Sequence, residues 1–384
     1  MTWMGKAQQI RRQNMKVNAV AGKLFSMLRE DGMRCCVLKG QGNALMYPNP
    51  YSRTPGDIDV WINASRERIM EYASKKFELG DDIRLQHLEA SLDGVPVELH
   101  FFPCSMNNPI YHARLQKWFL RNADLQCSNI VGLPDGAGDI AIPTTAFNVI
   151  YQLTHLYHHF FDEGIGMRQI IDYFLVVNDF SKNVFLNNDL SNHPVNFSNH
   201  PVPLSKEGST FSPSPSSSGS GDVTAPSRCS EPLRSKDGGP SKVSPDCAGW
   251  DRLAIEGDNS ATAVTSSAST ALDVVQRELK YLGLWKFSGA VMYVLHEALG
   301  LSDGKMIAPM DEKRGKLLLA EILNGGNFGK HFTKYGHFTQ QGMAKKYFLK
   351  IWRNMHFVRY YPAEALSEPI FRTWHFFWRL KHRR

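Results

Sequence analysis

Two aspartates, Asp57 and Asp59, stand two positions apart in the stretch GDIDVWIN, which otherwise has the composition of a buried strand. Successive side chains of a strand point to opposite faces, so these two carboxylates project from the same face. Carboxylates that lie side by side repel each other unless a cation lies between them. Because Mg²⁺ prefers one or two protein carboxylates together with phosphate oxygens and water, the pair predicts a metal site that faces phosphate.

A third acid is expected on a later strand, VPVELHFF (95–102). The alternation along that strand places Glu98 and His100 on one face, while Val97 and Leu99 turn toward the core. Three converging carboxylates are the minimum for a two-metal phosphoryl-transfer site, in which one metal activates a hydroxyl and the other neutralises a triphosphate.

A loop with two glycines precedes the aspartates. Gly40 and Gly42 follow a predicted strand, and they would let backbone N–H groups approach a phosphate at the start of a helix. Lys39 and Arg53 flank this loop, and their charges would neutralise a triphosphate, with Arg53 able to contact it through two N–H groups. Solvation at the surface is the alternative for both cations.

Helices and strands alternate in the part of the chain that must position these residues. Apolar residues at helical or alternating spacing, bounded by glycine, predict helices at 18–32 and 65–80, and strands at 33–40, 56–63, 82–91 and 95–103. Ser65 is the expected N-cap of the second helix. Asp93-Gly94 lies between two alternating runs and therefore predicts a β-hairpin turn.

The C-terminal half has helical periodicity that is interrupted once. Residues 144–180 predict two helices with a break near Gly164 and Gly166, and strong periodicity resumes at residue 271. The segment between them is rich in Ser, Pro, Gly and Asn, and it repeats the pentapeptide SNHPV, so it cannot bury enough apolar surface to order itself. We therefore predict a catalytic domain at 1–140, a helical domain formed by 141–180 and 271–384, and a disordered insertion at 181–270.

Length and composition are those of a globular protein. With 384 residues and 42% hydrophobic content, the chain is long enough for two or three domains with ordinary cores. The N-terminal MTWMGKAQQIRRQN lacks an apolar run after its charges, and the longest apolar runs are far too short to span a bilayer, so neither secretion nor a transmembrane helix is expected. Six cysteines without a CxxC pair, two of them adjacent, predict neither a zinc site nor a disulfide framework, which favours a cytoplasmic location.

The positive charge is concentrated at the C-terminus. The formal net charge is +7, and residues 341–384 alone contain ten Lys or Arg and two Glu. This basic, aromatic end is a candidate surface for an anionic partner such as nucleic acid, an anionic membrane or an acidic protein. The alternative is a helix packed by Trp374, Phe377 and Trp378 with a solvated charged end.

These residues resemble a known superfamily. A glycine after a strand, then Asp-x-Asp between hydrophobic residues, then an acid on a later strand, is similar to the DNA polymerase beta-like nucleotidyltransferases. The segments VLKG, YPNPYSRTPGDIDVWI, VELHFF, HLYHHFFDEGIGMRQIIDY and LGLWKFSGAVMYVLHE resemble its uncharacterised bacterial nucleotidyltransferase branch. This resemblance implies an α+β fold with a small mixed β-sheet and helices, followed by a mostly α-helical C-terminal domain.

The resemblance also implies an activity, namely transfer of a nucleoside monophosphate from an NTP to an acceptor hydroxyl, with release of pyrophosphate and dependence on Mg²⁺ or Mn²⁺. It assigns metal binding and catalysis to Asp57, Asp59 and Glu98. The predicted nucleotide-binding residues are Lys39, Gly40, Gln41, Arg53 and Arg168. The acceptor stays open among a small molecule, a sugar, a protein and RNA.

Two alternatives remain open at this stage. Gln41 stands where the superfamily pattern has Ser, which favours a binding or regulatory module that has kept the fold and lost turnover.

The histidines His155, His158 and His159 share one helix face by their spacing, and they are candidates for a zinc site, for contact with nucleotide or acceptor, or for ordinary polar packing. Arg168 also has the spacing of a structural ion pair with Asp172.

Overall fold

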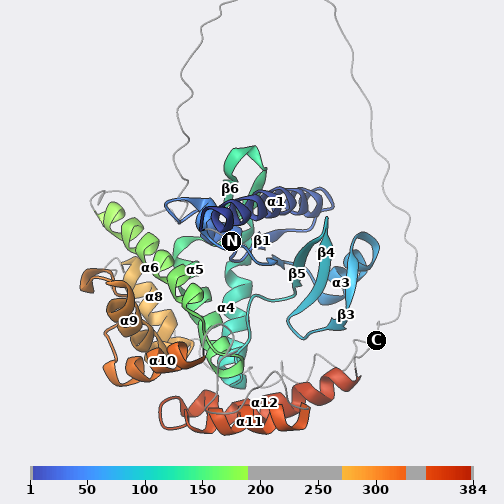
Figure 1. The fold of residues 1–384 in the computed structure, drawn as a ribbon. Helices are drawn as coiled ribbons and strands as arrows, with labels where there is room; N and C mark the ends of the chain where they lie inside the picture. Colours follow the sequence, from blue (N-terminus) through green and yellow to red (C-terminus); the bar gives the residue numbers. More distant parts are fainter. Residues whose placement is uncertain (1–2, 189–269, 326–342, 382–384) are drawn as a thin grey trace, which may run out of the picture. The chain divides into compact units, whose positions relative to one another are not determined.

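The computed structural model describes residues 3–188, 270–325 and 343–381 of the chain, which are the coloured parts of Figure 1. The α-helices are α1 (Trp3–Glu30), α2 (Gln41–Ala44), α3 (Arg66–Lys76), α4 (Pro109–Ser128), α5 (Thr145–Asp162), α6 (Met167–Asn188), α8 (Ala271–Tyr281), α9 (Trp285–Leu299), α10 (Glu312–Gly325), α11 (Met343–Met355) and α12 (Pro362–Lys381). The strands are β1 (Cys35–Val37), β2 (Ile58–Ile62), β3 (Glu78–Ile83), β4 (His87–Leu92), β5 (Val95–His100), β6 (Ile130–Gly132) and β7 (Asp139–Ala141).

Five of the strands form one mixed sheet in the order β1-β2-β5-β4-β3, and β6 pairs with β7. Strands β2 and β5 are parallel, while the other neighbours in the five-stranded sheet are antiparallel. The parallel pairing sets Asp59 directly opposite Glu98. This small mixed sheet, together with the helical C-terminal region, confirms the predicted α+β fold class.

The predicted hairpin at Asp93-Gly94 joins β4 to β5. Both residues have positive φ, 51° and 70°, the backbone that a two-residue hairpin turn requires and that Asp-Gly adopts readily. The turn fixes the register of the two strands, so that His87 lies opposite His100. A local sequence signal thereby determines which side chains of β4 meet those of β5.

Three elements near the sheet differ from the sequence prediction. Helix α1 begins at Trp3 rather than at residue 18, because its first half is exposed and polar and so carries no apolar periodicity. Helix α3 ends at Lys76, and the residues expected to finish it form β3, which pairs with β4. Helix α4 was not predicted, although Asn108 accepts hydrogen bonds from two backbone N–H groups at its start and Pro109 occupies its first position.

The buried apolar residues form two clusters. One cluster joins α1 to the sheet and includes Leu24 and Val60, and the other lies among the helices and includes Phe147 and Phe287. Helix α4 falls within the predicted domain at 1–140, yet its buried residues, such as Trp118, belong to the helical cluster. The proposed domain division at residue 140 therefore stays a prediction.

Helix α6 extends past the predicted start of the insertion at residue 181. Ser181 is buried, and its hydroxyl donates to the carbonyl oxygens of Val177 at 2.8 Å and Lys305 at 3.2 Å, which ties this part of the helix to the rest of the fold. The start of the predicted insertion is thus helical up to Asn188. The remainder, 189–269, lies outside the described residues.

The C-terminal helix α12 has both exposed and packed aromatic side chains. Phe377, expected to pack, is 62% exposed, whereas Trp378 lies under the guanidinium of Arg66, 5.3 Å from its ring centroid. Pro369 lies inside this helix. Among the described helices, none combines the length and the apolar character needed to cross a membrane.

Glu364, near the start of α12, is buried against the loop that precedes α4. Its carboxylate accepts hydrogen bonds from the backbone N–H groups of Asn107 at 2.5 Å and Asn108 at 3.2 Å. Burial raises the pKa of Glu364 to about 7, although these two hydrogen bonds oppose the rise. The carboxyl therefore links the C-terminal helix to the segment after β5 through a group that titrates near neutrality.

We expect this carboxyl to make stability depend on pH. With a pKa raised from 4.5 to about 7, the folded state holds the proton more tightly than the unfolded state. The contribution of Glu364 to the free energy of unfolding is therefore largest below about pH 4.5 and falls, by up to about 3 kcal/mol, as pH rises through 7. Urea unfolding of wild type and Glu364→Gln across this range measures the difference. An exposed acid on α9, Glu297→Gln, is the control, and parallel curves for wild type and Glu364→Gln would contradict the expectation.

Candidate functional site

The parallel pairing of β2 and β5 brings the three predicted acids together. Asp59 and Glu98 are register partners, and Asp57 lies immediately before β2. One carboxylate oxygen from each of the three residues lies within 4.8 Å of the others. The structure brings Asp57, Asp59 and Glu98 together, and their roles in metal binding and catalysis stay predictions. Three oxygen donors at this spacing suit a hard divalent cation such as Mg²⁺, which binds through oxygen ligands.

The two aspartates have opposite electrostatic surroundings. The negative charge of Asp59 raises the pKa of Asp57 to about 6, so the repulsion between the two carboxylates disfavours ionisation of Asp57. Burial of Asp59 opposes its ionisation, but Lys39 and His100 outweigh burial and hold the pKa of Asp59 below its ordinary value. Asp59 is thus ionised and paired without a metal, whereas at Asp57 the repulsion from Asp59 and burial outweigh the attraction of Lys39.

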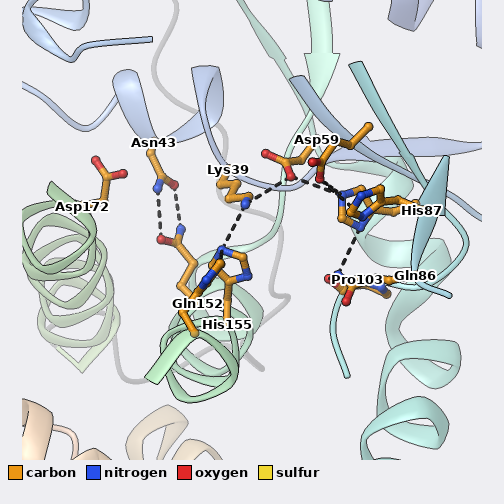
Figure 2. A network of polar contacts seen from close by, with 12 residues as sticks. Lys39, Asn43, Asp59, Gln86, His87, Pro103, Gln152, His155 and Asp172 are labelled. Atoms are coloured by element: carbon orange, nitrogen blue, oxygen red, sulfur yellow. Dashed lines mark hydrogen bonds and ion pairs between the residues drawn. The ribbon is translucent and has the colours of Figure 1, made fainter. Parts of the chain in front are cut away.

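Lys39, which follows β1, links the acids to helix α5. Its ammonium lies 3.1 Å from Asp59 Oδ1 and 3.0 Å from His155 Nε2, as Figure 2 shows. Burial, with the Lys39 charge second, lowers the pKa of His155 far below its ordinary value, so the neutral imidazole accepts a hydrogen bond from the lysine. Lys39 therefore positions the Asp59 carboxylate as well as adding positive charge to the site.

His100, on β5, contacts two of the three acids. Its Nε2 lies 3.2 Å from Asp59 Oδ1 and 3.2 Å from Glu98 Oε2. Burial alone would lower the pKa of His100, but the hydrogen bonds to the two carboxylates raise it to about 9. The sequence alternation had placed His100 beside Glu98, and the structure confirms that position.

His87, on β4, is a residue of this region that sequence reasoning missed. Its Nδ1 lies 3.4 Å from Glu98 Oε2, and its ring centroid is 5.0 Å from that of His100. Burial lowers the pKa of His87 to about 4, so the ring is neutral. The sequence feature that could have identified His87 is the Asp93-Gly94 turn, because this turn fixes the pairing of His87 with His100.

A cavity of about 270 Å³ opens over these groups. The three acids line it together with Lys39, Gly40 and the histidines of α5, His155, His158 and His159. Three further cationic side chains, Arg53, Arg84 and Arg168, also line it. The cavity thus combines a carboxylate cluster, positive charge and neutral imidazoles, which suits a polyanion held through a divalent cation.

The glycine loop contributes Gly40 to the lining of this cavity, whereas the next residue, Gln41, does not line it. Gly40 has φ of 60°, a conformation that favours glycine, and it directly precedes the short helix α2. Gln41 is buried and donates a hydrogen bond to the side chain of Asn18, away from the cavity lining. Asn43 lines the cavity instead, and its amide exchanges two hydrogen bonds with Gln152, at 3.0 and 2.7 Å (Figure 2).

The two arginines differ in how they are held. Arg53 is buried in a bidentate ion pair with Asp172, with N–O distances of 2.9 to 3.2 Å, and Tyr47 donates a hydrogen bond to the same carboxylate. Asp172 therefore pairs with Arg53 rather than with Arg168, which corrects the helical ion pair expected from spacing. Arg168 donates a hydrogen bond to the carbonyl oxygen of Thr54, at 3.4 Å, and within the described chain its Nε has no hydrogen-bond partner.

The histidines of α5 form a chain along one wall. His155 Nε2 lies 3.1 Å from His159 Nε2, and burial, the largest cause, lowers the pKa of His158 and lowers that of His159 to about 3. Among the described residues, the two groups able to hold a metal ion are Asp57–Asp59–Glu98 and His87–Glu98–His100, and neither includes these three histidines. They line the cavity with neutral imidazoles.

Comparison with known proteins agrees with the geometry. Residues 1–191 match a family described as uncharacterised nucleotidyltransferases. This match covers α1 to α6, including the sheet and every residue of the predicted site. The matched region is therefore similar in sequence to a nucleotidyltransferase family, which agrees with the coarser part of the resemblance.

One solved structure resembles the chain weakly. It is an antigenic nucleotidyltransferase-like protein from Paracoccidioides brasiliensis, with 16% identity and a TM-score of 0.28 over 46% of this chain and 85% of that one. A TM-score this low supports no conclusion about fold or function. No curated protein matches the chain.

Proposed function

We propose that this protein is a metal-dependent nucleotidyltransferase that moves a nucleoside monophosphate from an NTP to an acceptor hydroxyl and releases pyrophosphate. The observation that carries the proposal is the convergence of Asp57, Asp59 and Glu98 within 4.8 Å in a cavity that also contains cationic side chains. The family match of residues 1–191 supports the same class of reaction.

In this proposal the three acids hold Mg²⁺ or Mn²⁺. When bound, the cation supplies Lewis acidity at the phosphate oxygens and lowers the pKa of the attacking hydroxyl. Lys39 keeps the Asp59 carboxylate ionised and oriented toward the cation through their 3.1 Å contact. Gly40 presents backbone without a side chain at the cavity wall, where a triphosphate would otherwise meet a Cβ.

The wall formed by α5 suits the part of the ligand that is not phosphate. His155, His158 and His159 are neutral, so they offer hydrogen bonds without drawing the anionic phosphates away from the metal site. We assign this wall to the nucleobase or the acceptor. The predicted cytoplasmic location and the predicted anionic partner of the basic C-terminal end remain predictions.

The proposal is tested by incubating the purified chain with each NTP, labelled at the α-phosphate, together with Mg²⁺ or Mn²⁺ and a cell extract as acceptor pool. Transfer of label to one fraction, accompanied by pyrophosphate, is the expected result, and the labelled fraction names the acceptor class. Absence of both NTP binding and transfer with every NTP and either metal would overturn the proposal.

A binding module without turnover is the second candidate. It is favoured by Gln41, whose side chain is buried against Asn18, so no side-chain hydroxyl is offered where the superfamily pattern has Ser. The two candidates differ in one outcome of the same assay. A module would bind metal and NTP with the acids intact but would leave the label on the nucleotide with every acceptor fraction.

Arg168 is expected to contribute to NTP affinity. It lines the cavity, and its hydrogen bond to the carbonyl oxygen of Thr54 is long, 3.4 Å, so its charge is available to the triphosphate. A charge-assisted hydrogen bond contributes about 1.5–3 kcal/mol, so Arg168→Ala should weaken Mg²⁺-NTP binding by about 10- to 100-fold. Calorimetry measures this, with Arg34→Ala as the control because Arg34 forms an exposed pair with Asp124. Equal affinities of Arg168→Ala and wild type would exclude a phosphate contact.

A further inference from the structure

We propose that His87, Glu98 and His100 form a second cation site, for a borderline metal ion such as Zn²⁺, beside the carboxylate site. The three side chains come from the adjacent strands β4 and β5, and one ligand atom of each lies within 4.8 Å of the others. The site goes beyond nucleotidyl transfer, because it differs from the carboxylate site in its donor atoms. Glu98 belongs to both clusters, so the two cations would share one carboxylate.

The spacing of the donor atoms matches a zinc centre. Glu98 Oε2 lies 3.2 Å from His100 Nε2 and 3.4 Å from His87 Nδ1. Ligands at about 2.0–2.1 Å from a tetrahedral Zn²⁺ are separated from one another by about 3.3 Å, because the edge of a tetrahedron is about 1.6 times its centre-to-corner distance. The two separations from Glu98 are therefore close to those of zinc ligands, and all three donor atoms lie within 4.8 Å of one another.

His87 gives independent evidence that the cluster is made for a ligand. It is only 8% exposed, and within the described part of the chain neither of its ring nitrogens has a hydrogen-bond partner. A buried polar group without a partner is costly, and such groups are rare in folded proteins. His87 faces the Glu98 carboxylate through Nδ1, so a cation between them would use the nitrogen lone pair that the fold leaves unsatisfied.

The donor chemistry separates the two sites. The cluster of Asp57, Asp59 and Glu98 offers only oxygen, which suits Mg²⁺, whereas two imidazoles and one carboxylate suit Zn²⁺ and leave a fourth position open. That open position faces the cavity, which His87, Glu98 and His100 all line. A ligand in the cavity would therefore meet a hard cation and a borderline cation on either side of Glu98.

The competing interpretation makes His100 a permanent counter-ion. Its Nε2 contacts Asp59 and Glu98 at 3.2 Å each, so an imidazolium there would balance the acids without a metal. That interpretation gives His87 no role, because His87 would remain buried and unsatisfied. The two interpretations differ in whether loss of His87 changes metal affinity.

The test is a titration of the metal-stripped full chain with Co²⁺, whose visible absorption reports tetrahedral coordination, followed by displacement with Zn²⁺. We expect one equivalent of Co²⁺ to give the tetrahedral absorption. Loss of a hydrogen-bond partner behind a metal ligand already costs about 10- to 100-fold in affinity, so His87→Gln, which removes a ligand, should cost at least about 100-fold. His296→Gln, on α9 and outside the cluster, is the matched control and should bind as wild type does.

Two further variants keep this site separable from the proposed function. Asp57→Asn should lose Mg²⁺-NTP binding and retain Zn²⁺, whereas His87→Gln should lose Zn²⁺ and retain Mg²⁺-NTP binding. X-ray absorption of the Zn²⁺-loaded wild-type chain should show scattering from two imidazole rings, a readout that needs no variant to fold. Unchanged Zn²⁺ affinity in His87→Gln, or a zinc shell without imidazole, would overturn the second site, whatever the outcome for Mg²⁺-NTP.

Discussion

Asp57→Asn is expected to reduce nucleotidyl transfer at least about 1,000-fold, because a bound metal supplies several kcal/mol of transition-state stabilisation and each 1.36 kcal/mol is a factor of ten in rate. The metal-free fold should be at least as stable as wild type. Asp57 carries the repulsion of the pair, since the charge of Asp59 raises its pKa to about 6, and the substitution removes that repulsion. Transfer of α-labelled NTP and thermal melts in EDTA measure the two effects.

Asp59→Asn is the informative comparison. It should lose transfer to the same extent, but it should also destabilise the metal-free fold, because it leaves Lys39 and His100 without the buried carboxylate that they contact. Breaking a buried ion pair from one side costs on the order of 3 kcal/mol. The structure thus assigns relief of repulsion to Asp57 and a positional role to Asp59. Equal metal-free stability of the two variants would contradict this division of roles.

Asp172→Asn is expected to lower the free energy of unfolding by about 3–5 kcal/mol, because it leaves the buried guanidinium of Arg53 without its charged partner. The pair is 7% and 8% exposed at its two side chains, and it joins the segment before β2 to α6. Chemical unfolding measures the loss. The exposed pair of Glu71 and Lys75 provides the control, since Glu71→Gln should leave the free energy of unfolding almost unchanged.

The double variant Arg53→Met with Asp172→Leu sharpens this prediction. Replacing a buried ion pair by apolar residues of similar size is often neutral, so the double variant should recover most of the stability that Asp172→Asn loses. If the double variant is as unstable as the single variant, the loss comes from altered packing of α6 rather than from the unpaired charge. NTP affinity of the double variant then reports separately on the predicted contact between Arg53 and nucleotide.

The parts of the site that the sequence predicted depend on local rules. The alternation of side chains along a strand placed Glu98 and His100 on one face, and Asp93-Gly94 predicted the hairpin that aligns β4 with β5. Asp57 and Asp59 are neighbours in the chain, so their convergence needed no knowledge of the tertiary fold. The mixed sheet was implied by the family resemblance, because the parallel pairing of β2 with β5 joins strands that no hairpin connects.

The parts that the sequence did not predict depend on contacts between distant residues. Lys39 and His155 are separated by 116 positions and meet only because the tertiary fold brings α5 near the residue that follows β1. Arg53 and Asp172 are 119 positions apart, and their pairing competes with the local spacing that favoured Arg168. Periodicity carries no information about such pairs, because it reports the face on which a residue lies and not the element that covers this face.

The central claim is that three carboxylates hold a metal ion against an NTP, and binding tests it without knowledge of the acceptor. The measurement is calorimetric titration of the full chain with a non-hydrolysable NTP analogue in Mg²⁺ and, separately, in EDTA, for wild type and Asp57→Asn. The account predicts that wild type binds the analogue only with Mg²⁺ and that Asp57→Asn loses this binding while its fold stays intact. Binding of equal strength in Asp57→Asn, or binding in wild type that is indifferent to Mg²⁺, would contradict the assignment of Asp57, Asp59 and Glu98.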